Sequence, residues 1–315
     1  MKKAYNLLFE REIKSFKNVL NQLPTWCRYP LSAAKEATLY ELSYVKILTQ
    51  QLNLRPFLID LVEQKASAPF ILNFEVLESQ VFFYFMLEGE IKFTDQNGIF
   101  ISNIKANNFY ISYSRPGIFN ANVEKGDHIA LIVSIDTEWI YSISSEFEVL
   151  KKFLDEFINL SQNYAVMPLC RMDKQVHRWL REIYTFTRTN KGALDGLLRL
   201  YISLALEYYN KTLKEREGMM AYRLKKYLDE HYCDIDLDYI KLTKIFYATE
   251  RTLRNQFKAE FHITIHNYYT NLRLEKARYM ITDLGMQIKD VYMEVGYKDE
   301  SSFRYAYNKF INKYS

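Results

Sequence analysis

Four polar side chains in one short segment carry the hydrogen-bonding groups needed to read the edges of nucleic-acid bases. Arg251, Arg254 and Asn255 lie close together, and Lys258 follows them. An arginine can donate to both O6 and N7 of guanine, and an asparagine can pair with N6 and N7 of adenine. A lysine ammonium suits the phosphate backbone. The set predicts base contacts by the first three residues and a phosphate contact by Lys258.

A second set of polar residues lies nearer the C-terminus and is less basic. It consists of Glu300, Ser301, Ser302, Arg304 and Tyr305. Side chains of these types bond sugar and phosphate oxygens as readily as base edges. We therefore expect weaker contacts here, or contacts directed mainly to the DNA backbone.

The first set needs a helix to present it, and the neighbouring residues predict one. The apolar spacing from Leu237 to Phe246 indicates a short helix. After a turn, Thr249 is suited to be the N-cap of a second helix from Glu250 to Phe261. Leu253 and Phe257 would face the core, so the polar side chains project elsewhere. This order of elements is a helix-turn-helix unit of the kind that reads DNA.

A similar pattern returns near the C-terminus. The residues from Ile288 to Val295 predict a short helix, Gly296 permits a sharp turn, and Lys298 to Phe310 form the next helix. The segment from Asn267 to Thr282 reads as one longer helix between the two units. Two units joined in this way could place their second helices in successive major-groove segments, about 34 Å apart on one face of B-DNA.

These residues resemble the AraC/XylS family of bacterial transcription regulators. The order and spacing agree over roughly Met219 to Phe310. The matching positions are Thr249-x3-Leu253-x3-Phe257-Lys258, then Tyr268-x4-Arg273-Leu274-x2-Ala277-Arg278, then Ile288-x2-Val291-x3-Val295-Gly296-Tyr297-x-Asp299-x-Ser301-x-Phe303-x3-Tyr307-x-Lys309. The family's DNA-contact positions fall on Arg251, Arg254 and Asn255.

The sequence departs from the family pattern at several positions. Thr243 and Tyr292 replace a usual small Ala, and Tyr247 stands where a Gly or Asn is common at the first turn. His262 and Ile265 replace a usual Gly and Pro. The family's closing Gly-x-Ser-Pro segment is also missing, so we expect a less firmly packed last helix.

Charge adds a moderate attraction to phosphate. The whole chain has 42 Lys and Arg against 38 Asp and Glu, a net charge of +4. Such a small excess of positive charge does not by itself indicate a polyanionic partner. Besides Lys258, the candidate phosphate contacts are Arg273, Lys276 and Arg278, with a solvated helical face as the alternative explanation for some of them.

The first half of the chain has a different pattern. From about Ala68 to Ile135, short β-rich runs alternate with turn residues, which indicates a small antiparallel barrel or sandwich. The run from Val81 to Leu87 reads as a buried strand, with alternate residues on its two faces. Helical spacing around Leu7, Ile13, Phe16 and Leu20 leaves the role of the first 65 residues open. Many AraC/XylS proteins carry a sensor barrel here.

Amphipathic helices follow from about Glu148, with apolar stripes that could form either a dimer seam or intramolecular packing. The predicted fold is α+β. A β-rich, cupin-like sensor and dimerisation domain covers residues 1–147, a helical linker 148–218, and an all-α DNA-binding domain with two helix-turn-helix units 219–315.

Composition and motifs argue against catalysis and export. His128 is the only histidine of the β-rich region, and no His-x-His pair, Gly-x-Ser-x-Gly elbow or phosphate loop occurs, so we expect neither an enzyme nor a metal or cofactor site. Cys27, Cys170 and Cys233 are widely spaced, which favours a reducing compartment. The charged N-terminus and the short apolar runs predict a cytoplasmic protein without a membrane segment.

The sequence thus predicts a regulator that binds double-stranded DNA. The resemblance implies a small-molecule effector in the barrel, a homodimer and contact with RNA polymerase. The alternative is an effector-binding or protein-interaction module whose C-terminal helices dock a protein instead of DNA.

Overall fold

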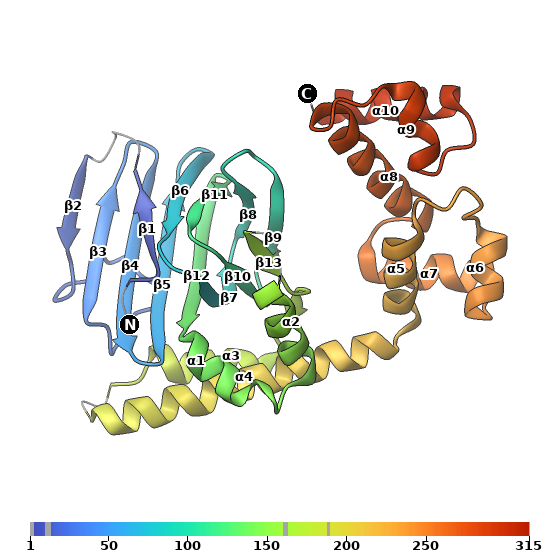
Figure 1. The fold of residues 1–315 in the computed structure, drawn as a ribbon. Helices are drawn as coiled ribbons and strands as arrows, with labels where there is room; N and C mark the ends of the chain where they lie inside the picture. The colour runs from blue at the N-terminus through green and yellow to red at the C-terminus, as the bar shows by residue number, and fades with distance from the viewer. Residues whose placement is uncertain (1–2, 10–13, 160–162, 188–189, 315) are drawn as a thin grey trace. The chain divides into compact units, whose positions relative to one another are not determined.

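The computed structural model describes residues 3–9, 14–159, 163–187 and 190–314. The chain divides into two compact units, Met1–Leu213 and Lys214–Ser315. Figure 1 shows that the first unit is built mainly of strands, with helices at one side of them, and that the regular elements of the second are helices.

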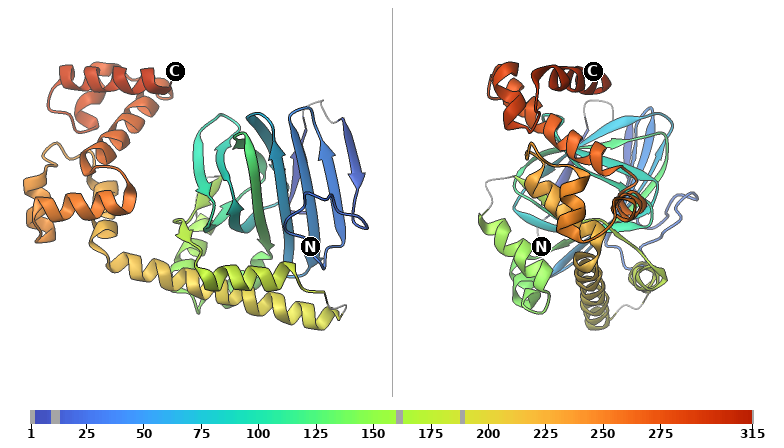
Figure 2. Two further views of the ribbon diagram at one scale, coloured as in Figure 1. Left: turned by 180° about the vertical axis from the view of Figure 1, so that it is seen from behind. Right: turned by 90° about the vertical axis from the view of Figure 1, so that its right-hand side faces the viewer.

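The strands of the first unit form two antiparallel sheets (Figure 2). A five-stranded sheet has the order β1-β6-β11-β8-β9, and a nine-stranded sheet has the order β13-β10-β7-β12-β5-β4-β3-β2 with β14 paired to β10. The strands are β1 (Tyr5–Leu8), β2 (Ser15–Asn18), β3 (Glu36–Glu41), β4 (Val45–Leu54), β5 (Phe57–Ala66), β6 (Phe70–Val76), β7 (Gln80–Glu88), β8 (Glu90–Asp95), β9 (Phe100–Lys105), β10 (Asn108–Ser114), β11 (Gly117–Val123), β12 (Gly126–Ile135), β13 (Tyr164–Val166) and β14 (Cys170–Arg171).

The predicted β-rich domain is confirmed, in the form of two stacked sheets: the described strands do not close into a barrel. Strand structure also begins earlier than the sequence pattern suggested. Leu7 and Phe16, which have helical spacing, lie in strands β1 and β2, and Leu20 follows β2 in a turn. Ile13 lies outside the described residues.

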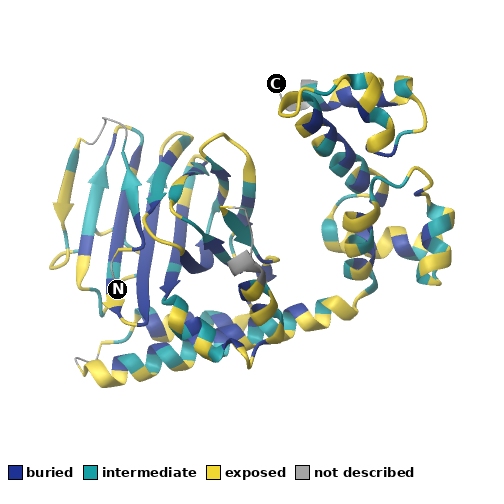
Figure 3. Cartoon of the chain, viewed as in Figure 1, coloured by how far each residue is buried: buried dark blue, intermediate teal, exposed yellow. Residues whose placement is uncertain are grey.

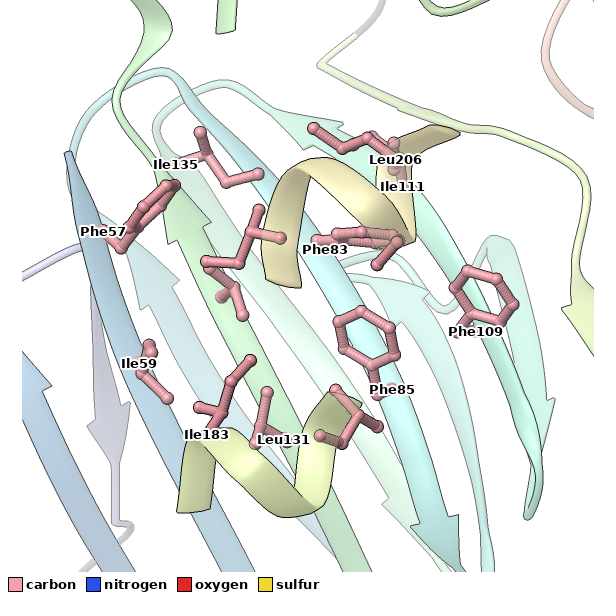
Figure 4. Close-up of a cluster of buried hydrophobic side chains, with 14 of the residues drawn as sticks. Phe57, Ile59, Phe83, Phe85, Phe109, Ile111, Leu131, Ile135, Ile183 and Leu206 are labelled. Atoms are coloured by element: carbon pink, nitrogen blue, oxygen red, sulfur yellow. The ribbon is translucent and has the colours of Figure 1, made fainter. Parts of the chain in front are cut away.

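Both faces of the nine-stranded sheet are covered. One face packs on helices α1 (Thr137–Ser144), α2 (Glu148–Asn159), α3 (Lys174–Tyr184) and α4 (Lys191–Gly218), and the other faces the five-stranded sheet. Strand β7 shows the alternation directly, because Phe83 and Phe85 join the helix-side core while Tyr84 and Met86 lie between the sheets. Figure 4 shows Phe83, Phe85 and Phe109 beneath turns of helix, with Leu206 and Ile183 above the same sheet.

The apolar stripe of α4 is used within the chain. Leu198, Ile202, Leu206 and Tyr209 are buried in the helix-side core, and Tyr209 donates its hydroxyl proton to the carbonyl oxygen of Pro168 over 2.7 Å. The sequence left open whether this stripe forms a dimer seam or packs within the chain. These four side chains pack within the chain.

The second unit consists of six helices arranged around two small cores, as Figure 3 shows by the dark inner faces of its helices. Leu228, Leu242, Leu253 and Phe257 belong to the first core, and Val291 belongs to the second. The helices are α5 (Met220–His231), α6 (Tyr239–Phe246), α7 (Glu250–Phe261), α8 (Ile265–Thr282), α9 (Ile288–Glu294) and α10 (Glu300–Tyr314).

Candidate nucleic-acid interface

Helices α6 and α7 form the first helix-turn-helix unit at the residues that the sequence predicts. Thr249 caps α7, because its side-chain oxygen accepts the amide proton of Thr252 over 3.2 Å. Asp238 caps α6 in the same way through Lys241 N. Leu253 and Phe257 are fully buried, so α7 is fixed by its apolar face and its opposite face is left to solvent.

Two departures from the family pattern occupy unusual backbone positions. Tyr247, at the end of α6, has φ = 49°, and His262, at the end of α7, has φ = 56°. Both are in the left-handed region, where a Cβ atom is unfavourable and Gly or Asn is common. The backbone therefore keeps the turns for which Gly is the usual residue, although the side chains differ. The Tyr247 side chain is 95% exposed.

The predicted base-reading residues of α7 are all exposed. Arg251, Arg254, Asn255 and Lys258 lie outside the buried stripe of the helix. The structure adds two partners that sequence reasoning missed. Arg254 forms an ion pair with Glu250 one turn earlier, and its guanidinium carbon lies 4.2 Å from the ring centroid of Tyr239. The first partner could have been found from the four-residue spacing.

Helices α9 and α10 form the second helix-turn-helix unit. Gly296 takes φ = 84° at the turn, and Asp299 begins α10 by accepting the amide proton of Ser302 over 2.8 Å and the hydroxyl proton of Ser301 over 2.5 Å. These hydrogen bonds, that of Ser301 foremost, lower the pKa of the Asp299 carboxyl. The hydroxyl of Ser301 thus already has an acceptor within the protein. Ser302 is exposed.

The second helix-turn-helix unit contains an ion pair like the one between Glu250 and Arg254 in the first. Arg304 Nη2 lies 2.5 Å from the Glu300 carboxylate, again four residues apart at the start of the second helix of the unit. Tyr305 is 74% exposed, whereas Phe303 is fully buried and Tyr307 nearly so. Each helix-turn-helix unit therefore has an exposed arginine that pairs with the glutamate at the start of its second helix.

Arg273 does not serve as the predicted phosphate contact. Its side chain is buried at 8% exposure, and it donates from Nε to the carbonyl oxygen of Tyr232 over 2.5 Å and from Nη2 to that of Asp234 over 2.7 Å. The guanidinium carbon also lies 4.9 Å from the ring centroid of Tyr269 and 5.6 Å from that of Tyr297. Burial lowers the pKa of Arg273. The residue ties α8 to the loop between α5 and α6.

The other two phosphate candidates differ from each other. Arg278 is exposed on α8. Lys276 is half-buried, and its Nζ lies 3.4 Å from Cys233 Sγ and 5.9 Å from the Tyr232 ring centroid. Lys276 is therefore partly engaged by the same loop that Arg273 holds.

A second candidate site is an apolar cavity of about 100 Å³ between the two sheets of the N-terminal unit. Strands of both sheets line it, and nine of the twenty lining residues are aromatic. Its residues are Tyr5, Leu7, Val62, Gln64, Leu72, Phe74, Phe82, Tyr84, Ile91, Phe93, Ile101, Tyr110, Ser112, Tyr113, Ser114, Phe119, Ala121, Ile132, Tyr164 and Val166.

His128 is a packed residue of strand β12. It is buried, its Nδ1 accepts the amide proton of Glu90 over 3.1 Å, and its Nε2 lies 2.8 Å from the carbonyl oxygen of Glu124. Within the described ranges, no cluster of His, Cys, Asp and Glu could hold a metal ion. Among the same residues, no helix combines the length and apolar character needed to cross a membrane.

Comparison with known proteins finds a sequence match in the C-terminal helices. Residues 242–313 match a family described as a helix-turn-helix domain. The transcriptional activators RhaR of Enterobacter sp. and of Salmonella newport are each 30% identical over 62 residues, which is 20% of this chain and 22% of theirs. The match thus spans about a fifth of the length of these curated relatives.

Several solved structures also align with this chain. CuxR, an AraC-like transcriptional activator, aligns with 80% of this chain and 86% of its own at 10% identity and a TM-score of 0.36. ToxT from Vibrio cholerae aligns with 80% of this chain and 94% of its own at 15% identity and a TM-score of 0.31. The C-terminal domain of AraT from Geobacillus stearothermophilus covers 28% of this chain and 74% of its own at 24% identity and a TM-score of 0.28.

Proposed function

We propose that this chain, whose C-terminal domain is an AraC/XylS-type domain with two helix-turn-helix units, is a sequence-specific DNA-binding transcription regulator. The observation that carries the proposal is the repeated design of α7 and α10. Each helix follows a sharp turn, buries one apolar face, and exposes an arginine that is held by a glutamate one turn earlier.

Helix α7 is the main reading helix in this proposal. Arg251, Arg254 and Asn255 contact base edges, since Arg and Asn can each bond a purine through two atoms. Lys258 contacts phosphate. In α10, Glu300, Ser301, Ser302, Arg304 and Tyr305 make weaker or backbone-directed contacts, because this set is less basic than that of α7. Ser301 and Glu300 also bond within the helix start.

The N-terminal unit supplies regulation in the proposed mechanism. A small effector binds between the sheets and shifts the population of DNA-binding states. The AraC/XylS resemblance further leads us to propose a homodimer that contacts RNA polymerase and acts in the cytoplasm, where bacterial DNA lies. The chain works as a regulator and not as an enzyme.

Selection from random-sequence double-stranded DNA with the full chain tests the proposal. We expect an enriched motif whose affinity falls when Arg254 is replaced by Ala. The matched control is Arg223→Ala, because Arg223 is also an exposed arginine on a helix but lies outside both helix-turn-helix units. Circular dichroism checks that both variants fold.

Failure to enrich any motif would overturn the proposal and favour the alternative in which the C-terminal helices dock a protein. An enriched motif that Arg254→Ala and Arg223→Ala weaken equally would contradict the assignment of α7 as the reading helix.

A further inference from the structure

The lining of the cavity between the sheets restricts the chemistry of its occupant. Its twenty residues include no Asp, Glu, Lys, Arg or His. Bringing an ion out of water into such surroundings is strongly unfavourable unless an opposite charge meets it. The lining offers no such charge. A charged ligand is therefore disfavoured whatever its sign.

Asp60 adds a further barrier to anions. It is buried on β5, and residues 60, 62 and 64 share one face of that strand, so the carboxyl lies on the cavity side near Val62 and Gln64. Its Oδ1 accepts a hydrogen bond from Gln51, and its Oδ2 has no hydrogen-bond partner among the described residues. A carboxylate ligand would meet repulsion from this group, whereas a cation would gain no direct contact with it, because Asp60 is not among the lining residues.

The aromatic rings do not form an open cage for a cation. Tyr84 and Tyr110 stack on each other with centroids 5.7 Å apart, and Phe74 packs against Phe119 at 5.7 Å and against Phe93 at 6.1 Å. A cation needs the free face of a ring within about 6 Å. Each of these pairings covers one ring face that a cation would need, so the lining suits apolar contact.

One polar group in the lining has no partner. Gln64 is only 5% exposed, lines the cavity, and its Oε1 accepts no hydrogen bond from the described residues. Leaving such a group unpaired in a buried place is unfavourable. A bound molecule with a hydroxyl or amide group would remove that cost, because the Gln64 amide can pair with either.

We infer that the cavity binds a small, uncharged and mainly apolar molecule whose single polar group pairs with the side-chain amide of Gln64. One water occupies roughly 10 to 15 Å³ on the same volume scale, so the space suits a molecule of about ten non-hydrogen atoms. That this molecule is the effector rests on the proposed function, whereas the binding itself does not.

The test uses three probes that share one skeleton and differ in charge: 3-phenylpropanol, 3-phenylpropanoate and 3-phenylpropylammonium. Their affinities for the full chain are measured at pH 7 by isothermal titration calorimetry without DNA. We expect the alcohol to bind at least tenfold more tightly than either ion. Equal or tighter binding of an ion, or no binding of the alcohol, would overturn the inference.

Three variants locate the binding. Gln64→Leu should weaken the alcohol about tenfold, the loss expected for one hydrogen bond. Ala121→Leu should abolish binding, because Ala121 lines the cavity and is buried. Ile118→Ala is the control, since Ile118 lies on the same strand but is 42% exposed and absent from the lining. An unchanged affinity in Gln64→Leu contradicts the role of the amide.

The two proposals can fail separately. A chain that enriches a DNA motif but binds no alcohol contradicts the cavity inference alone. A chain that binds the alcohol between the sheets but enriches no motif contradicts the regulator proposal alone.

Discussion

Arg273 on α8 donates a hydrogen bond from Nη2 to the backbone carbonyl oxygen of Asp234 over 2.7 Å. This bond joins the long central helix of the C-terminal unit to the loop that leads into its first helix-turn-helix unit. The ring of Tyr297, from the turn of the second unit, lies against the same guanidinium. Arg273 therefore contacts both the loop before the first helix-turn-helix unit and the turn of the second.

Replacing Arg273 with Met should lower the free energy of unfolding of the C-terminal unit by about 2 to 4 kcal/mol. The reason is that two carbonyl oxygens lose their charged donor in a buried place. Urea unfolding of the full chain measures the change. Arg278→Met, on the exposed side of the same helix, should change the value by less than about 0.5 kcal/mol. Equal effects of the two variants would show that burial of Arg273 contributes nothing.

Gly296→Ala should disrupt the same junction. A Cβ at this position would lie 2.6 Å from the carbonyl oxygen of Cys233 and 2.8 Å from its carbonyl carbon, and the residue has φ = 84°. Gly285→Ala measures the effect of backbone conformation alone on stability. Gly285 also has a positive φ, 67°, but a Cβ added there would meet no other atom within 4 Å. We expect a loss of about 1 kcal/mol for Gly285→Ala and a clearly larger loss for Gly296→Ala in the same unfolding measurement.

Substitution of His262 by Gly should stabilise the protein by up to about 1 kcal/mol, because His262 adopts φ = 56° and Gly relieves that strain. The same substitution at His266, in the first turn of helix α8, should instead destabilise by up to about 1 kcal/mol. Thermal unfolding of the two variants checks the opposite signs. Destabilisation by both would contradict the strain at His262.

Glu250 should restrain the affinity for DNA while holding Arg254. Glu250→Gln removes one negative charge beside the reading residues, so affinity should rise and depend more steeply on salt. Arg254→Ala should weaken DNA binding by about 1 to 3 kcal/mol and relax specificity at one base pair.

Lys258→Ala should lower the affinity for all DNA sequences by a similar factor, because a phosphate contact does not depend on the base. Titrations of the selected motif and its single-base variants at several salt concentrations separate these three results.

Stability should depend on pH through Asp60. Burial, as the main cause, raises the pKa of this carboxyl to about 6. In the unfolded chain its pKa is about 3.9, so between pH 4 and 6 the unfolded state loses the proton first and is stabilised relative to the folded state. The folded protein should therefore lose roughly 2 to 3 kcal/mol of stability as pH rises through this range and little more above it.

Asp60→Asn is the variant that isolates this effect, because it keeps the side-chain shape but does not titrate. The difference between the free energies of unfolding of the two proteins should shift in favour of the variant between pH 4 and 6. A difference that does not vary with pH would mean that Asp60 ionises equally readily in both states.

Local patterns were sufficient to predict the C-terminal helices. The apolar spacing of α7, its Thr249 cap and the turn at Gly296 are interactions within a few residues, so each is readable without the rest of the fold. The buried strand at residues 81–87 was readable for the same reason, since it is a continuous apolar run.

The first strands were not readable in this way. Strand β5 is almost wholly buried although it contains Asp60, Glu63 and Gln64. Glu63 is tolerated there because distant groups donate to it, the amides of Arg28 and Tyr29 at 3.0 and 2.9 Å and the thiol of Cys27 at 3.2 Å. Such partners cannot be predicted from the residues next to Glu63 in the sequence.

By itself, the sequence determined the two helix-turn-helix units, the apolar residues of their cores and the polar residues on α7 and α10. Only the tertiary structure decided that Arg273 is buried, that Gln64 faces a cavity, and that the strands stack as two sheets. The physical reason is the separation along the chain between the residues that interact. Helix periodicity and capping depend on neighbours along the chain, whereas the burial of a polar side chain depends on groups that folding brings from far away.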